Sequence, residues 1–282
     1  MTAQLILQAP DLRPSDVEKL AAIAQANGVQ NLKRTAVRLI DVDADSKGDI
    51  AHCCSMLGID FAFLARIKPL SECRILASDM DSTLINIECI DEIADMAGRK
   101  AEVSAITEAA MRGEIKDFKE SLVRRVALLR GVPVAALEKV YQERLQLNPG
   151  AESLIAAAKQ AGLKTLLVSG GFTFFTDRLK ARLGLDETRA NTLEIVDGML
   201  TGRVLGDILD GHGKAEAVRE LAARLHARPE HIIVLGDGAN DLEMMALADY
   251  SVAYRAKPIV SEQANYALNV GGLDSILEWF NA

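Results

Sequence analysis

Four short apolar runs that alternate with helical segments constrain the fold of this chain more than any other feature. They are "RILAS" at residues 74–78, "GLKTLLVS" at 162–169, "HIIVLG" at 231–236 and "YSVAY" at 250–254. Continuous apolar strands that alternate with helices are typical of a parallel sheet covered on both faces. We therefore expect an α/β fold with a Rossmann-like parallel sheet over residues 73–282.

Two regions depart from this alternation. Residues 1–71 read as a small α+β unit, with strands at 3–8, 32–42 and 60–67, helices at 15–27 and 50–59, and a boundary near Pro69. Residues 89–147 contain helical stretches and no good strand, which predicts a helical domain inserted after the first core strand, in the position of a lid. The run at 193–204 carries Asp197-Gly198 between two strand-like segments, a hairpin signal.

Polar residues gather where three of the predicted strands end. Asp79, Asp81 and Thr83 follow the first strand, Ser169-Gly170-Gly171 the second, and Gly236 to Asp241 the third. In open α/β sheets the ligand binds outside the carboxyl ends of the strands. Because these three ends fall on one edge, their convergence indicates a functional site better than any single motif does.

The D-x-D spacing by itself is a weak signal, because the chain contains it three times, at 41/43, 43/45 and 79/81. The first two overlap in a stretch that resembles the start of a calcium loop, but that loop needs Gly and Glu where Ser46 and His52 stand. An acidic solvated loop is favoured there. Asp79 and Asp81 differ because an apolar strand delivers them to the ligand edge, although a role as helix caps or turn formers stays open.

Three carboxylates on one sheet edge, Asp79, Asp81 and Asp237, would repel one another unless a cation lies between them. An oxygen-only set of ligands that leaves room for water and phosphate suits Mg²⁺. Residue 81 could contribute its backbone carbonyl as well as its side chain. Asp241 could order metal-bound water from a second shell, or cap the helix that follows, or do both.

Two features predict a phosphate site beside the carboxylates. Ser169 precedes a pair of glycines, whose backbone N–H groups can approach an anion closely, although the same triplet also forms ordinary turns. Lys214 stands in the first turn of a predicted helix, where the helix dipole disfavours a cation. That position favours a phosphate contact over a merely solvated lysine.

Arg125 lies on the apolar stripe of a predicted helix in the insertion, with Phe118, Leu122, Val126 and Leu129. A guanidinium that faces the protein interior needs an anion. It could pair with a structural carboxylate or hold a substrate carboxylate in a bidentate contact. In a lid above a phosphate site, the second role is favoured.

Charge and composition exclude some partners. The net charge of −8 and the sequence pI near 5.2 argue against nucleic acid and against anionic membranes. No apolar stretch approaches the roughly 20 residues of a membrane span, and no signal peptide is evident, so we expect a cytoplasmic protein. The four cysteines lack a zinc spacing and are expected as reduced, mostly buried thiols.

Taken together, these motifs resemble the haloacid-dehalogenase-like hydrolase superfamily, and within it the phosphoserine phosphatase family. "DMDSTLINIECIDEIA", "VSGGF", "GHGKAEAV" and "GDGANDLEMM" match the four motifs in order, and "FKESLVRRVALLRG" matches the lid helix. The resemblance covers about residues 73–280. Met80, where many relatives have Phe, changes no reacting group.

The resemblance implies roles for the residues that react and bind metal. Asp79 would be the nucleophile and a Mg²⁺ ligand. Asp81 would be the general acid/base and would bind the metal through its carbonyl. Asp237 would complete the protein's ligands, with Asp241 behind them.

It also implies a set of residues that hold the substrate. The phosphoryl group would contact Ser169, Gly170 and Lys214, and Asn240 would assist there. Glu88 and Arg125 would recognise the amino and carboxylate groups. Phe118 and Met111 match the lid's apolar wall, although a purely structural role is as well supported for these two.

The function that follows is Mg²⁺-dependent hydrolysis of O-phospho-L-serine through a phosphoaspartate, the last step of serine biosynthesis. The resemblance also suggests a shortened, amino-acid-binding (ACT-like) domain at residues 1–71. Two rival functions stay open: action on another small phosphate ester, and a non-catalytic amino-acid sensor. The sequence leaves the oligomeric state open, a homodimer included.

Overall fold

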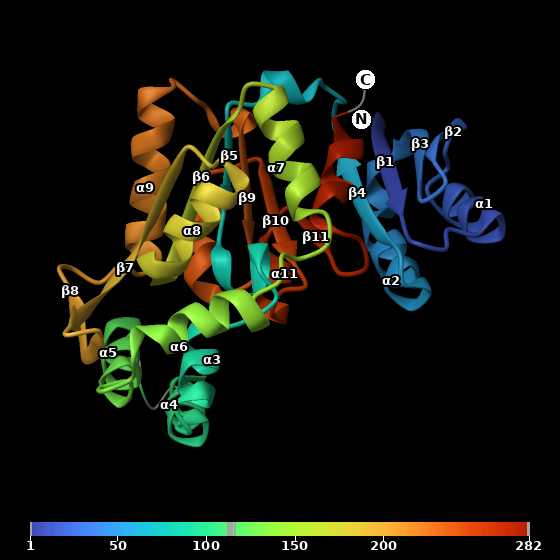
Figure 1. Ribbon diagram of the computed structural model, residues 1–282. Helices are drawn as coiled ribbons and strands as arrows, with labels where there is room; N and C mark the ends of the chain where they lie inside the picture. The colour runs from blue at the N-terminus through green and yellow to red at the C-terminus, as the bar shows by residue number, and fades with distance from the viewer. Residues whose placement is uncertain (1, 112–114, 116, 281–282) are drawn as a thin grey trace.

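A single sheet runs through the computed structural model, which describes residues 2–111, 115 and 117–280 (Figure 1). Its strand order among these residues is β2-β3-β1-β4-β11-β10-β9-β5-β6-β7-β8. The predicted core strands are all present, as β5 (Ile75–Ser78), β6 (Lys164–Phe172), β9 (Ile232–Gly236) and β10 (Tyr250–Tyr254). They pair in parallel, so the α/β prediction is confirmed.

Helices cover both faces of these strands, because alternate strand residues point to opposite sides. Leu76, on one face, belongs to a core cluster with α7 (Ala151–Gln160), α8 (Thr173–Leu183) and the 3-10 segment η7 (Leu273–Trp279). Its neighbours Ile75 and Ala77 belong to a second cluster under α9 (Gly211–Arg224) and α10 (Leu242–Met245). Burial on both faces explains why the strands are apolar throughout.

The hairpin predicted at Asp197-Gly198 is present, and its first strand also pairs with the core strand β6. Strand β7 (Glu187–Val196) pairs in parallel with β6 through its first half and antiparallel with β8 (Met199–Leu205) through its second. Both turn residues adopt positive φ, 51° at Asp197 and 76° at Gly198, as this kind of tight turn requires. The hairpin therefore projects beyond the sheet.

The N-terminal unit has the element order βαββαβ. It consists of β1 (Thr2–Gln8), α1 (Pro14–Ile23), β2 (Gly28–Lys33), β3 (Ala36–Asp43), α2 (Lys47–Leu57) and β4 (Asp60–Leu64). With its antiparallel sheet order β2-β3-β1-β4, this is a ferredoxin-like arrangement.

Two local predictions for this unit were wrong. The run at 32–42 is not one strand, because it turns at residues 34–35 and folds back as the β2–β3 hairpin. The helix expected to reach residue 27 ends at Ile23, because the chain must enter β2 at Gly28, which pairs with Ile40. Pairing within the sheet outweighs the helical pattern of the residues in between.

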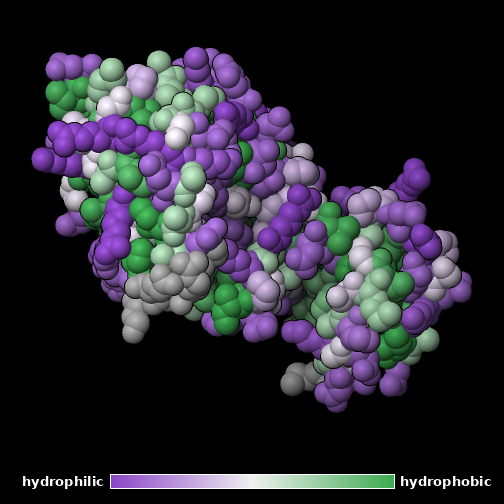
Figure 2. Space-filling view, turned by 90° about the horizontal axis from the view of Figure 1, so that it is seen from below, coloured by the Kyte–Doolittle hydropathy of each residue, from purple (hydrophilic) through white to green (hydrophobic). Residues whose placement is uncertain are grey.

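One buried carboxylate fastens the N-terminal unit to the core. Asp60 begins β4, which pairs with the core strand β11 (Tyr266–Leu268). Its side chain accepts hydrogen bonds from the backbone N–H groups of Asn269, Val270 and Gly271, at 2.7 to 3.2 Å. Figure 2 shows the two parts as a larger and a smaller lobe joined by a narrower waist.

The insertion consists of four helices among the described residues. They are α3 (Cys89–Met96), α4 (Lys100–Met111), α5 (Phe118–Leu128) and α6 (Val134–Lys139), and they lie beyond the carboxyl ends of β5 and β6 (Figure 1). Backbone hydrogen bonds from Gly131 to Leu200 and from Val134 to Gly198 join them to the β7–β8 hairpin. Within the described chain, no helix has the length and apolarity needed to cross a membrane.

Replacing Asp60 with Ala is predicted to lower the free energy of unfolding by about 3 kcal/mol, because three backbone N–H groups would lose their charged acceptor. Urea denaturation measures the change. Asp49→Ala, an exposed carboxylate in the first turn of α2, is the matched control and should change stability by less than about 0.5 kcal/mol. Equal unfolding curves for the two variants would contradict the role assigned to Asp60.

Candidate active site

A buried lysine holds two aspartates together at the end of β5. Lys214, in the first turn of α9, is 1% exposed, and its Nζ donates to Asp79 Oδ1 at 2.7 Å and to Asp241 Oδ1 at 2.8 Å. Asp79 directly follows β5, and Asp241 follows β9 after a short loop. The prediction that these strand ends converge is therefore confirmed by geometry.

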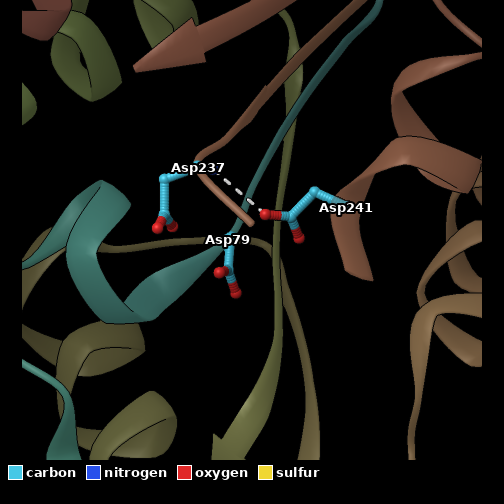
Figure 3. A group of neighbouring side chains, drawn as sticks. All are labelled: Asp79, Asp237 and Asp241. Atoms are coloured by element: carbon cyan, nitrogen blue, oxygen red, sulfur yellow. Dashed lines mark hydrogen bonds between the residues drawn. The ribbon is translucent and has the colours of Figure 1, made fainter. Parts of the chain in front are cut away.

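Asp237 completes a cluster of three carboxylates (Figure 3). One oxygen each of Asp79, Asp237 and Asp241 lies within 4.8 Å of the others. The three do not have equal freedom to bind a metal. Asp241 Oδ1 is taken by Lys214, and its Oδ2 accepts the backbone N–H groups of Asp237 and Gly238. Asp241 is thus engaged on both oxygens.

The electrostatics of this cluster favour a cation. Burial, followed by the charge of Asp241, raises the pKa of Asp79 well above its ordinary value. The same two causes raise the pKa of Asp237 to about 6. Burial lowers the pKa of Lys214, but Asp241 and Asp79 outweigh it and the net shift is upward. A single lysine therefore does not neutralise the group, and its oxygen-only ligands fit a divalent metal ion.

Asp81 lies between the start of α3 and the Ser169-Gly170-Gly171 loop. Its Oδ1 accepts the backbone N–H of Cys89 at 3.2 Å, and its Oδ2 lies so close to Gly171 that a Cβ there would be 2.7 Å away. Burial, followed by the charge of Glu88, raises the pKa of Asp81 to about 7. The sharp turn after Asp79 makes this orientation available, and Ser82 adopts a positive φ of 58° within it. A carboxyl group that titrates near neutral pH can both give and take a proton.

The Ser169-Gly170-Gly171 loop forms the opposite wall. The β6–β7 register breaks between Val168 and Phe172, which frees this stretch from the ladder. Ser169 is 1% exposed, and its hydroxyl accepts the N–H of Gly171 at 2.9 Å. A Cβ on Gly170 would lie 2.9 Å from the ring of Phe118, so only glycine lets this lid residue come so close.

Glu88 and Arg125 lie close enough for the charge of each to affect the pKa of the other. Glu88 is open to solvent and accepts a hydrogen bond from Ser82 Oγ at 2.7 Å. Burial lowers the pKa of Arg125, and the charges of Asp91, Glu88 and Asp81 oppose that shift. Among the described residues Arg125 makes no ion pair, and its one hydrogen bond is from Nε to the carbonyl of Ser121 at 3.4 Å. Its guanidinium is available to an anion.

The structure thus brings together nearly all of the predicted site residues. Asn240 belongs to the same loop as Asp237, and its carbonyl lies against Gly211 at the start of α9. Met111 ends α4, but its side chain lies outside the described part of the structure.

Sequence reasoning assigned no role to several supporting residues. Thr83 donates to Asp237 Oδ1 at 3.0 Å. Asn148 donates to the carbonyls of Thr83 and Ile85 at the root of the insertion, and Asn191 donates to the carbonyl of Gly170. Thr83 was visible as a polar residue after the first strand, whereas the two asparagines carried no signal beyond a turn or a strand.

An ion pair connects α5 of the lid to the residue that caps α9 of the core. Lys119 Nζ of α5 lies 3.0 Å from Asp210 Oδ2. Asp210 also caps α9, because its Oδ1 accepts the N–H of Gly213 at 3.0 Å. The helix that presents Lys214 and the helix that presents Phe118 and Arg125 are therefore joined at their first turns.

Comparison with known proteins gives a family for this arrangement. A haloacid dehalogenase-like hydrolase family model matches residues 76–246. A second model, described only as a domain of unknown function, matches residues 5–50.

Individual relatives agree with the family match. A phosphoserine phosphatase of Polaromonas sp. is 62% identical over 213 residues, which cover 74% of this chain and 90% of that protein. The crystal structure of a probable phosphoserine phosphatase from Vibrio cholerae superposes with a TM-score of 0.85 at 36% identity, over 99% of this chain and 87% of that one. A HAD family hydrolase from Salmonella enterica serovar Typhi reaches a TM-score of 0.89 at 32% identity, over 99% and 98% of the two chains. The chain belongs to the haloacid dehalogenase-like hydrolase family.

Proposed function

We propose that this protein is a phosphoserine phosphatase, which hydrolyses O-phospho-L-serine to L-serine and phosphate and so completes serine biosynthesis. One observation carries the proposal: the site combines two oppositely charged side chains, which can recognise a substrate, with a carboxylate and a lysine that can act on its phosphate. Glu88 and Arg125 supply opposite charges above the Asp79–Lys214 pair. A substrate with an ammonium, a carboxylate and a phosphate ester fits all of them, and a sugar phosphate offers neither of the first two. The names of the relatives support the same substrate.

In the first half of the reaction, Asp79 attacks phosphorus and the bond to the serine oxygen breaks. Lys214 lies 2.7 Å from Asp79 Oδ1 and lowers the repulsion between that carboxylate and the incoming phosphate. Asp81, with a pKa of about 7, gives its proton to the leaving serine oxygen. Ser169 and Gly170 hold the phosphoryl oxygens.

In the second half, water hydrolyses the phosphoaspartate. Asp81 takes a proton from this water, which attacks phosphorus and releases phosphate from Asp79. The same carboxyl group therefore serves both halves and ends in its starting state. We propose Mg²⁺ as the divalent ion, bound by Asp79, Asp237 and the carbonyl of Asp81, with Asp241 ordering the ligands from behind. When bound, it offsets the negative charge of phosphate and carboxylates.

We propose that the N-terminal unit is a shortened ACT-like domain that binds an amino acid. Its βαββαβ order and sheet order support this proposal. Its edge strand is fixed to the core through Asp60, which offers a direct connection.

The oligomer is proposed as a homodimer, which sedimentation of the purified chain tests.

The function is tested by phosphate release from phosphoserine, phosphothreonine, phosphoethanolamine and a set of sugar phosphates. Phosphoserine should give the highest kcat/KM, because it alone satisfies Glu88 and Arg125 without an extra methyl group. Chelation of divalent ions should abolish the activity, and added Mg²⁺ should restore it. A preference for sugar phosphates would favour another phosphatase function, and no release from any ester would favour a sensor.

Asp79→Asn should lower kcat by at least about 10³-fold, because the amide cannot form the phosphoaspartate. Asp45→Asn changes an aspartate of another D-x-D pair and should leave turnover unchanged. Acid quenching with ³²P-labelled substrate should leave label on Asp79 of the unmodified protein. Label on a different residue, or substantial turnover by the variant, would show that Asp79 is not the nucleophile.

L-Serine should inhibit the enzyme with a noncompetitive component if the N-terminal unit binds an amino acid that regulates turnover. Simple product inhibition at the active site is competitive with phosphoserine, so the two patterns separate in initial-rate measurements. Inhibition that is competitive at every concentration, together with the same result for glycine and L-alanine, would contradict regulation by amino acids.

A further inference from the structure

Arg125 has a position in the lid that is unusual for a cation. It sits on the apolar stripe of α5 between the buried residues Leu122 and Val126, and no carboxylate among the described residues comes within ion-pair distance of its guanidinium. Burial of an unpaired guanidinium is unfavourable. Something other than a direct ion pair must orient the guanidinium of Arg125 before substrate arrives.

Asp91 is a carboxylate with a buried oxygen that, among the described residues, is likewise unpaired. It lies in the first turn of α3, three residues after Glu88, and its backbone N–H donates to the carbonyl of Glu88 at 3.1 Å. Within the described chain, its Oδ1 is buried and has no hydrogen-bond partner. Native proteins rarely leave a buried carboxylate oxygen unsatisfied, so the group calls for an explanation.

Asp91 and Arg125 each oppose the effect of burial on the pKa of the other. Burial raises the pKa of Asp91, and Arg125 is the cation that opposes this most, ahead of Lys100. Burial lowers the pKa of Arg125, and Asp91 is the carboxylate that opposes this most, ahead of Glu88 and Asp81. Each is therefore the principal counter-charge of the other, at a separation beyond that of an ion pair.

The separation matters for recognition of a zwitterion. If Arg125 paired directly with Glu88, each would neutralise the group that the other presents to the substrate. A third charge set behind them can hold Arg125 while both recognition groups stay open. Asp91 is suited to that role, because it lies in the first turn of α3, which Glu88 precedes as N-cap, and α3 packs against α5.

We propose that Asp91 is a positioning residue for substrate specificity, which acts through Arg125 and not on the reacting atoms. Its partly buried carboxylate directs the guanidinium towards the substrate carboxylate and leaves Glu88 free for the ammonium. The inference rests on the proposed function, because it takes a phosphorylated amino acid as the substrate.

The alternative is a structural role for Asp91 in the first turn of α3, where a carboxylate interacts favourably with the helix dipole. Glu92 shares that turn and that dipole effect, but pairs with Arg144 on the far side. Glu92→Gln is thus a matched control for a loss of charge at the same helix end. The two variants separate a dipole effect from an effect on Arg125.

The test compares Asp91→Asn, Glu92→Gln and the unmodified protein on phosphoserine and on phosphoethanolamine, which keeps the ammonium but lacks the carboxylate. Asp91→Asn should raise KM for phosphoserine about fivefold with little change in kcat, as expected for loss of a partly screened charge interaction. Its KM for phosphoethanolamine should not change. Where turnover of phosphoethanolamine is too slow, its inhibition constant against phosphoserine gives the same comparison.

A double-mutant cycle with Arg125→Ala gives the decisive measurement. If Asp91 acts through Arg125, adding Asp91→Asn to Arg125→Ala should not raise KM further. Additive effects, equal losses on both substrates, or the same KM change in Glu92→Gln would overturn the proposal. If the unmodified protein does not hydrolyse phosphoserine, the proposed function itself fails, which is a different result from an intact enzyme that is indifferent to Asp91.

Discussion

The buried contact of Lys214 with Asp79 and Asp241 is the interaction on which the rest of the site depends. A fully buried ammonium is strongly unfavourable unless it is paired, and removing either partner leaves an uncompensated charge. Here the lysine comes from α9 and the two aspartates from the ends of β5 and β9. One cation therefore fixes the relative position of three elements that are far apart in the sequence. The remaining excess of carboxylate charge creates the demand for a metal ion.

The lid is tied to this centre at three places. Asn148 binds backbone carbonyls at its root, the β7–β8 hairpin holds the α5–α6 connection, and Lys119 pairs with Asp210 at the first turn of α9. Because Asp210 caps the helix that presents Lys214, closure of the lid and alignment of the lysine share one residue. Arg125 on the lid and Asp79 in the core are thus connected through direct contacts between the two parts.

The residues of the proposed site could be located from sequence because each follows a strand or lies in a helix with a clear pattern. Apolar runs located Asp79, Ser169 and Asp237, and the parallel topology then placed them on one edge. Arg125 was found because it is a charged residue on the apolar stripe of a helix, and a charged group that faces the interior needs an oppositely charged partner. In each case the information lay within about fifteen residues of sequence.

The residues that escaped prediction act only through tertiary contacts. Asn148 and Asn191 each bind a backbone carbonyl that lies 21 or more residues away, and no local pattern announces such a partner. The β2–β3 hairpin was read as one strand because its turn at residues 34–35 contains no Gly, Pro or Asn. The β4–β11 junction depends on Asp60. In the sequence this residue resembles any other strand residue, and only the structure shows that it binds the three N–H groups at 269–271.

That junction also explains why an enzyme core would carry the N-terminal unit. A short strand such as β11 would otherwise expose an unpaired edge, and open edges promote aggregation. Strand β4 covers it, and Trp279 beneath donates to Gln8 of β1 at 2.9 Å, so the core's last segment packs against the added unit. A unit built into the sheet in this way has a structural purpose whether or not it binds a ligand. The β4–β11 pairing and the hydrogen bonds of Asp60 connect this unit directly to the core. A ligand bound to the unit would therefore influence the core through the packing at β4 and β11.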